Sequence, residues 1–339
     1  MKHDPRLHST IAHPMSVFRV DSWGWRLACP EQPARDYRQL LQHRLAKMAE
    51  RRAITVMVHG AGFSPFSNRG DAQSTLYSRH MGGARWQARS WPTRFASAGA
   101  PPNESLAIGY GWNATNDALL SKPHNQILFD AAGAEAPFFS SLINTLHDIG
   151  EGRDINVVCV GLGARVVVQS LADITPGALS RVVILAGHEF STNTLTALSA
   201  RGAKGVSFYN LRTDQLAASD QRANAEMPKS GPKDQMLALG FLFQRKNWVD
   251  VDTSLGAHRL QLLPGARQAV AKRSCKWSFG PDRVIDDLVG RICHSGVNTT
   301  VQAIKQRIAV SEADVGNGEL RFLQRHFAIM SPIVRRRAF

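Results

Sequence analysis

The stretch Ile155–Ala172, INVVCVGLGARVVVQSLA, decides the fold. Its first six residues are apolar on both faces, a pattern typical of a strand buried inside a parallel sheet. From Ala164 onward the apolar residues, Val166 and Leu171 among them, have the spacing of a helix that buries one face. A glycine turn at 161–164 joins the two parts. The stretch therefore predicts a strand that turns sharply into a helix.

Short apolar runs of the same kind recur on both sides of this unit. They are Ala53–His59, Leu106–Trp112, Val182–Ala186 and Val206–Leu211. Stretches with helical spacing separate them, among them Ala134–Ile149 and Thr194–Ala200. This alternation predicts an α/β protein with a doubly wound, mostly parallel central sheet flanked by helices. Right-handed crossovers then bring the carboxyl ends of the strands to one edge, where ligands bind in such folds.

One domain with large loop insertions is expected, because no Pro-, Gly- or Ser-rich linker divides the chain. Residues 53–310 are expected to form the α/β domain, with insertions near 68–103 and 217–274. Residues 1–52 are expected to pack on this core as strands and a helix. Residues 311–339 are expected to form a C-terminal helix and a basic tail.

Patterns before and after the core support this division. Ser16–Cys29 alternates between apolar and polar residues around a Ser-Trp-Gly break, which predicts two short antiparallel strands. Ala34–Arg52 has the spacing of a surface helix. After the second insertion, Arg283–Ile292 and Thr299–Ala309 also have helical patterns.

The chain is strongly basic. Its 339 residues include 41 Lys and Arg against 27 Asp and Glu, a formal net charge of +14. The excess is largest from Leu255 to Phe339, where 14 basic residues stand against 6 acidic ones. A field of this sign favours anionic partners such as nucleic acid, acidic lipid headgroups or anionic substrates.

Composition also excludes several classes of protein. No run approaches the roughly 18 apolar residues of a transmembrane helix, and the amino terminus lacks the apolar segment of a signal peptide. The cysteines are widely spaced, so neither a disulfide framework nor a zinc site is expected. Reduced cysteines make a cytoplasmic setting the expectation. The four are Cys29, Cys159, Cys275 and Cys293.

No pattern in the chain predicts a metal or a cofactor. Glycines at 161 and 163 follow a strand, as in a dinucleotide-binding turn, but Val166 stands where the third glycine of that motif belongs. His124, His147 and His188 stand apart from other ligand-type residues. Each is therefore expected to be a surface or core histidine.

A turn reading His59-Gly60-Ala61-Gly62 follows the first apolar run. Together with the later strand-turn-helix unit, it resembles the α/β-hydrolase superfamily, to which many esterases and lipases belong. The resemblance covers residues 53–309. It implies that the turn at 59–62 and the N–H of Leu162 face the carbonyl oxygen of a substrate and stabilise its developing charge.

The nucleophile position of that family falls on Gly161. Active members carry a serine there, within the turn G-x-S-x-G, whereas residues 159–163 read Cys-Val-Gly-Leu-Gly. Glycine has no side chain that can attack a carbonyl. The resemblance therefore implies a degenerate hydrolase that keeps a cleft for a small-molecule or acyl-type ligand.

The resemblance also implies positions for the two other catalytic residues. Asp214 follows a predicted strand, as the acid does in the family, although a helix cap is an equal explanation for it and Glu189 is a second candidate. The family order places the histidine after the acid. His294, expected in a loop before a late helix, fits this order, and His258 competes with it.

Two other functions stay open. An active ester or acyl hydrolase could use Cys159 as its nucleophile, or a water polarised by His294 and Asp214. A basic scaffold could instead bind nucleic acid or an anionic surface. The sequence specifies neither the ligand nor the oligomeric state.

Overall fold

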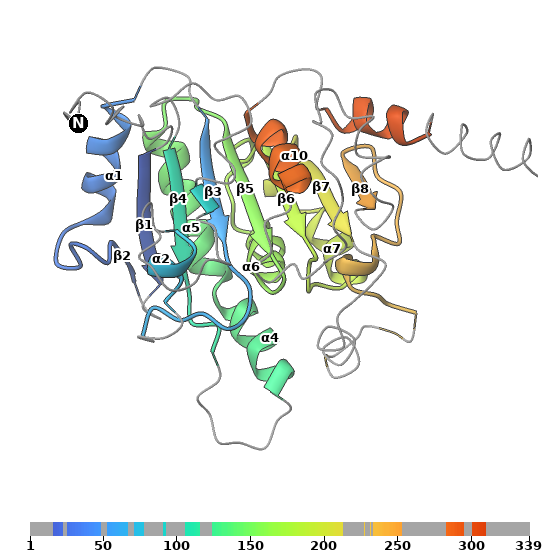
Figure 1. Cartoon of the computed structure of the whole chain (residues 1–339), viewed down its shortest axis with the longest axis horizontal. Coiled ribbons are helices and arrows are strands. Elements are labelled where there is room, and N and C mark those ends of the chain that lie inside the picture. The colour runs from blue at the N-terminus through green and yellow to red at the C-terminus, as the bar shows by residue number, and fades with distance from the viewer. Residues whose placement is uncertain are drawn as a thin grey trace, which may run out of the picture.

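An eight-stranded, mostly parallel sheet forms the centre of the computed structural model, as the alternation of strands and helices predicts (Figure 1). The strand order is β2-β1-β4-β3-β5-β6-β7-β8. The strands are β1 (Ser16–Ser22), β2 (Leu27–Ala28), β3 (Ile54–Val58), β4 (Leu106–Gly111), β5 (Ile155–Val160), β6 (Arg181–Leu185), β7 (Ser207–Arg212) and β8 (Trp248–Asp252). The structure describes residues 16–22, 26–48, 53–66, 71–77, 91–92, 106–115, 124–212, 227, 231, 233–252, 283–294 and 300–309.

The three central strands β3, β5 and β6 end level with one another. Val58 of β3 is paired with Cys159 of β5, and Cys159 with Ile184 of β6. These strands are buried on both faces, which explains their continuous apolar sequences. Their parallel register brings the residues that follow each strand to the same edge of the sheet.

The first two strands pair antiparallel, as the alternation of Ser16–Cys29 predicts, but β1 also enters the main sheet. It runs parallel to β4, with Val20 opposite Tyr110. Asp21 at the end of β1 is buried and accepts a hydrogen bond from Gln73, and burial raises the pKa of its carboxyl to about 6.

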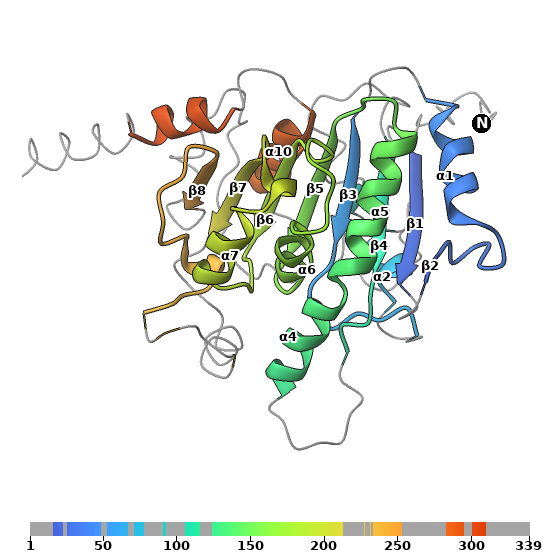
Figure 2. The ribbon, with the colours of Figure 1, turned by 180° about the vertical axis from the view of Figure 1, so that it is seen from behind.

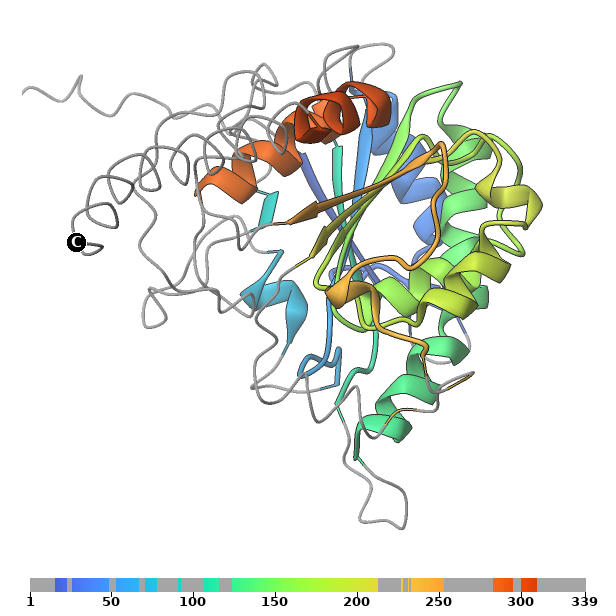
Figure 3. The ribbon, with the colours of Figure 1, turned by 90° about the vertical axis from the view of Figure 1, so that its right-hand side faces the viewer.

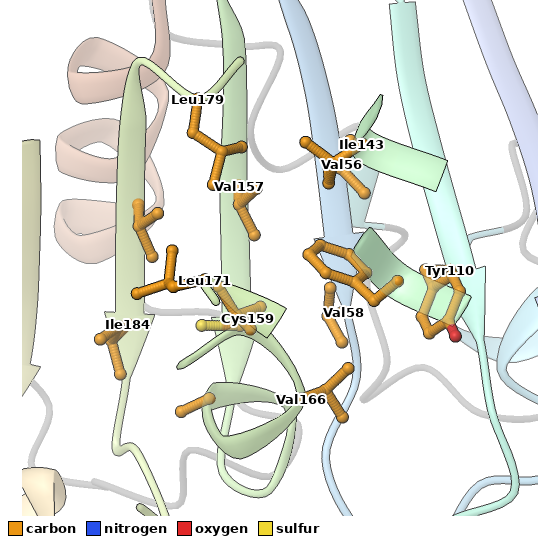
Figure 4. Close-up of a cluster of buried hydrophobic side chains, with 14 of the residues drawn as sticks. Val56, Val58, Tyr110, Ile143, Val157, Cys159, Val166, Leu171, Leu179 and Ile184 are labelled. Atoms are coloured by element: carbon orange, nitrogen blue, oxygen red, sulfur yellow. The ribbon is translucent and has the colours of Figure 1, made fainter. Parts of the chain in front are cut away.

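Five helices pack on one face of the sheet (Figures 2 and 3). They are α1 (Tyr37–Leu45), α4 (His124–Ala134), α5 (Ala136–Ile149), α6 (Gly163–Ser170) and α7 (Ser191–Ala197). Their apolar sides meet alternate strand residues, for example Ile143 against the side of the sheet that carries Val56 and Val157 (Figure 4). The predicted helix 134–149 corresponds to α5, which begins at Ala136, shortly after the end of α4. Pro137 lies in the first turn of α5, where proline is tolerated.

The opposite face is covered by α2 (Ala72–Thr75), α10 (Arg283–His294) and the helical segment 301–309 (Figure 3). Met57, Val158 and Val183 point to this side and pack with Val289 and Ile304. The central sheet is therefore a middle layer between two apolar cores, as expected of a doubly wound fold.

Strand β8 lies inside the region 217–274, which the sequence analysis treats as an irregular insertion. Its five residues, WVDVD, are too short and too polar to stand out as an apolar run. Short 3-10 helices at Arg201–Ala203 and Leu237–Leu239 complete the connections around β7 and β8. Among the described residues, no helix is long and apolar enough to cross a membrane.

Candidate functional site

The turns that follow β3, β5 and β6 meet at the carboxyl edge of the sheet. A β-carbon built on Gly161, after β5, would lie 3.8 Å from Nδ1 of His188, after β6, and 3.9 Å from the Cα of Gly60, after β3. Three segments distant in sequence thus surround one position, the Gly161 slot. This edge is where ligands bind in open α/β sheets.

Gly161 adopts the left-handed conformation, with φ of +53°. Its N–H donates to the carbonyl of Leu185 at 3.0 Å, and its carbonyl accepts from the N–H groups of His188 (2.9 Å) and Ala164 (3.1 Å). These bonds fix the turn between strand and helix. No atom of the described residues, apart from the neighbours of Gly161 in the chain, lies closer than 3.8 Å to a β-carbon at this position, so these residues leave room for a small side chain.

Two neighbouring glycines let the turns after β3 and β5 approach each other. A β-carbon on Gly60 would lie 2.9 Å from the carbonyl oxygen of Val160. One on Gly163 would lie 2.7 Å from the carbonyl oxygens of both Val58 and His59. Because these neighbours are backbone atoms that cannot move aside, glycine is required at both positions.

Two backbone donors lie in these turns. Among the described residues, no carbonyl or side chain accepts a hydrogen bond from the N–H of Ala61 or of Leu162. By contrast, the N–H of Gly62 donates to the carbonyl of Ala114 at 2.9 Å, which ties the 59–62 turn to the segment after β4. One N–H in each of the two turns that meet at the slot is therefore without an acceptor among the described residues.

His59 is a structural residue. Its Nε2 accepts a hydrogen bond from the N–H of Trp112 at 3.1 Å, so its Nδ1 carries the proton and donates to the carbonyl of Gly60 at 2.8 Å. The ring stacks on Trp112, with centroids 5.6 Å apart. Complete burial lowers the pKa of His59 to about 4. The imidazole is therefore neutral and holds the 59–62 turn against β4.

His188 is the histidine nearest the Gly161 slot among the described residues, whereas its sequence context predicts only a surface or core histidine. Its backbone N–H bonds to Gly161, and its ring nitrogen faces the position of a β-carbon there. As an isolated histidine it carries no motif. Its position is informative nonetheless, because His188 follows β6, the strand next to β5. Residues that follow neighbouring parallel strands lie at the same end of the sheet.

Glu189, the second candidate for the acid, is engaged in a different task. Its carboxylate is fully buried and accepts from Arg165 Nη1 at 2.8 Å, Gln169 Nε2 at 3.0 Å and Asn193 Nδ2 at 2.9 Å. The Arg165 guanidinium also lies over the ring of Phe129, 3.6 Å from its centroid. Glu189 therefore ties α6 and α7 to the end of β6.

The structure does not bring His294 to Gly161. His294 was expected in a loop, but it is the last residue of α10. The helix reaches this far because its amphipathic pattern continues to the end of RVIDDLVGRICH. The carbonyls of Ile292 and Cys293 accept from Arg181 (3.1 Å) and Asn156 (2.8 Å), at the amino ends of β6 and β5. His294 thus lies at the opposite edge of the sheet from Gly161.

The other two predicted members, Asp214 and His258, lie outside the described residues. Cys159 is described, and it is part of the core (Figure 4). Its thiol is fully buried and donates to the carbonyl of Val183 at 3.6 Å, and burial raises its pKa well above the usual range. A protonated, inaccessible thiol does not act as a nucleophile.

Comparison of the sequence with protein-family models and with curated proteins finds no match. In the described ranges, no group of three or more His, Cys, Asp or Glu side chains is arranged to hold a metal ion. The geometry around Gly161 therefore carries the functional argument.

Proposed function

We propose that this chain is an α/β-hydrolase-like protein that has lost its nucleophile and binds a small acyl-type ligand at the Gly161 slot. The left-handed backbone of Gly161, at a turn between a central strand and a helix, supports this proposal most directly. A nucleophile elbow has the same placement, at a sharp strand-to-helix turn at the top of the sheet.

The surrounding donors support a carbonyl or carboxylate group as the part of the ligand that is recognised. In active hydrolases the N–H after the nucleophile and an N–H from the loop after β3 bind the substrate oxygen. Leu162 and Ala61 occupy the corresponding positions here, and their N–H groups are available among the described residues. A ligand oxygen between them would receive two hydrogen bonds.

The three predicted catalytic groups that the structure describes cannot act at this position. Gly161 lacks a side chain, the Cys159 thiol is sealed in the core, and His294 lies at the far edge of the sheet. These three observations support binding without acyl transfer as the function of the site.

Two measurements test the proposal. Purified protein should neither hydrolyse p-nitrophenyl butyrate nor react with a fluorophosphonate probe. Butyrate, titrated against ¹⁵N-labelled protein, should shift the amide signals of Ala61 and Leu162. Covalent labelling at a mapped residue would overturn the loss of chemistry, and unmoved amide signals would overturn the binding site.

A matched pair of variants controls for local strain. Gly161→Ser fills the slot and should weaken butyrate binding. Gly205→Ser places the same side chain at another left-handed glycine, with φ of +84° and, in the part of the chain that the structure describes, no contact within 4 Å of its β-carbon. It should leave binding unchanged. Equal effects of the two substitutions would show that the slot does not hold the ligand.

A further inference from the structure

A cavity lies along β8, at the end of the strand order opposite β2. Its volume is about 380 Å³, in the range of sites for small organic ligands. It is lined by Phe241 and residues 243–245, by the first three residues of β8 and by residues of the helical segment 301–309, which lies beside β8 in Figure 1. It is therefore separate from the Gly161 slot, which follows β5 at the carboxyl edge.

The floor and one wall of this cavity are aromatic. Trp248 is packed between Phe208 (ring centroids 5.5 Å apart) and Phe241 (4.4 Å), so its own faces are covered. Phe243 packs on Phe241 at 5.5 Å and is only partly buried. Ile308 of the helical segment also lines the cavity. Phe243 and Ile308 thus offer apolar surface to a flat ring.

Two cations line the same cavity. Lys305 donates from Nζ to the backbone carbonyl of Arg245, which holds the two residues together. Neither side chain is paired with a carboxylate among the described residues, and the guanidinium of Arg245 has no acceptor there. Uncompensated cations beside an apolar wall attract an anion that can also bury a ring.

One carboxylate, that of Asp250, also lines the cavity. It is engaged by the protein itself, since Oδ1 accepts from Asn210 (2.7 Å) and from Trp248 Nε1 (3.0 Å), and Oδ2 accepts from the N–H of Phe241 (2.9 Å). Three N–H donors of the protein thus occupy its oxygens, and neither Arg245 nor Lys305 is among them. Arg245 and Lys305 therefore stay available for a ligand.

We propose that this cavity binds a small anion that carries a flat aromatic ring, of the chemical class of a nucleoside monophosphate. The phosphate would lie between Arg245 and Lys305, and the ring against Phe243. The inference does not depend on the Gly161 slot. It also gives a specific place at which the basic character of the chain meets an anion.

Calorimetric titration with three probes tests the two halves of the ligand separately. Adenosine monophosphate has both ring and anion, adenosine lacks the anion, and inorganic phosphate lacks the ring. The monophosphate should bind at least about tenfold more tightly than either fragment, because each fragment loses one set of contacts.

Variants locate the binding. Arg245→Ala and Lys305→Ala should each weaken binding of the monophosphate about tenfold or more. Lys246→Ala removes the same charge from the adjacent exposed residue, which does not line the cavity, and should change little. Equal weakening by Lys246→Ala would mean nonspecific attraction and would overturn the proposal. So would monophosphate binding no tighter than that of phosphate, or unchanged by both cavity variants.

Discussion

Replacement of Gly161 by alanine measures whether the slot is open. The left-handed backbone costs a residue with a β-carbon about 1–2 kcal/mol. Alanine also restricts the unfolded chain more than glycine does, which stabilises the folded state by about 0.4–1 kcal/mol. Because the nearest atom of the other described residues is 3.8 Å from the new carbon, these residues add no steric cost. The free energy of unfolding should therefore fall by about 1 kcal/mol.

Gly163→Ala is the contrasting variant. Its backbone is helical, so it carries no left-handed strain, but the new carbon would lie 2.7 Å from two backbone oxygens. Strand β3 and helix α6 would have to separate, at a cost of about 3 kcal/mol. Gly205→Ala, left-handed and open, should match Gly161→Ala.

Urea unfolding distinguishes these costs. If the free energy of unfolding falls by about 3 kcal/mol per M urea, the midpoint of unfolding should move by about 0.3 M for Gly161→Ala and about 1 M for Gly163→Ala. The slope itself should not change. A shift for Gly161→Ala as large as that for Gly163→Ala would refute an open slot, and with it the proposal that a small side chain once occupied it.

Further expectations concern buried polar groups. The carboxyl of Asp21 has a pKa of 3.8 when exposed and about 6 when folded. Its contribution to stability is therefore complete below about pH 4, and about 3 kcal/mol is lost as the pH rises through about 6. In urea titrations over that pH range, the free energy of unfolding of Asp21→Asn should rise relative to that of the wild type, and a constant difference would contradict this. The pKa of His59 falls from 6.5 to about 4 on folding, so the contribution of its neutral ring to stability is lost as the pH falls through that range. The free energy of unfolding of His59→Gln should therefore decrease less than that of the wild type over the same pH range. Glu189→Gln leaves Arg165 without its anion and should lower the free energy of unfolding by about 3 kcal/mol, whereas a loss below about 1 kcal/mol would show that the pair is not structural. Cys159 should resist iodoacetamide, as followed by mass spectrometry, while the chain stays folded; modification under native conditions would show that its burial is transient.

The sheet could be predicted from sequence because its central strands are buried on both faces. A short run such as INVVCV is stable mainly as a strand that is covered on both faces, and the glycine turn after it marks the start of a helix. Strand β8 could not be found in this way, since its stability comes from side chains contributed by other segments, such as Phe208 and Phe241 against Trp248. Edge strands carry weaker patterns than central ones.

The candidate site was predictable only where the backbone defines it. Gly161 and the turn at 59–62 follow from strand ends and glycine spacing. Side chains such as His188 depend on which strands become neighbours, which local patterns do not specify. His294 shows the converse, because chain order alone selected a residue that the path of α10 carries to the wrong edge of the sheet.

The parallel pairing of β1 with β4 has a consequence for how the chain is made. Ser16 pairs with Leu106, 90 residues further along, so β1 leaves the ribosome long before its partner exists. At about 5–20 residues per second, the wait is roughly 5–20 s. During that time β2 is the one described strand that can pair with β1, and the edge of β1 that pairs with β4 in the folded chain stays free. An unfinished chain that stops before β4 therefore presents a free strand edge, and that edge is where such fragments are expected to aggregate.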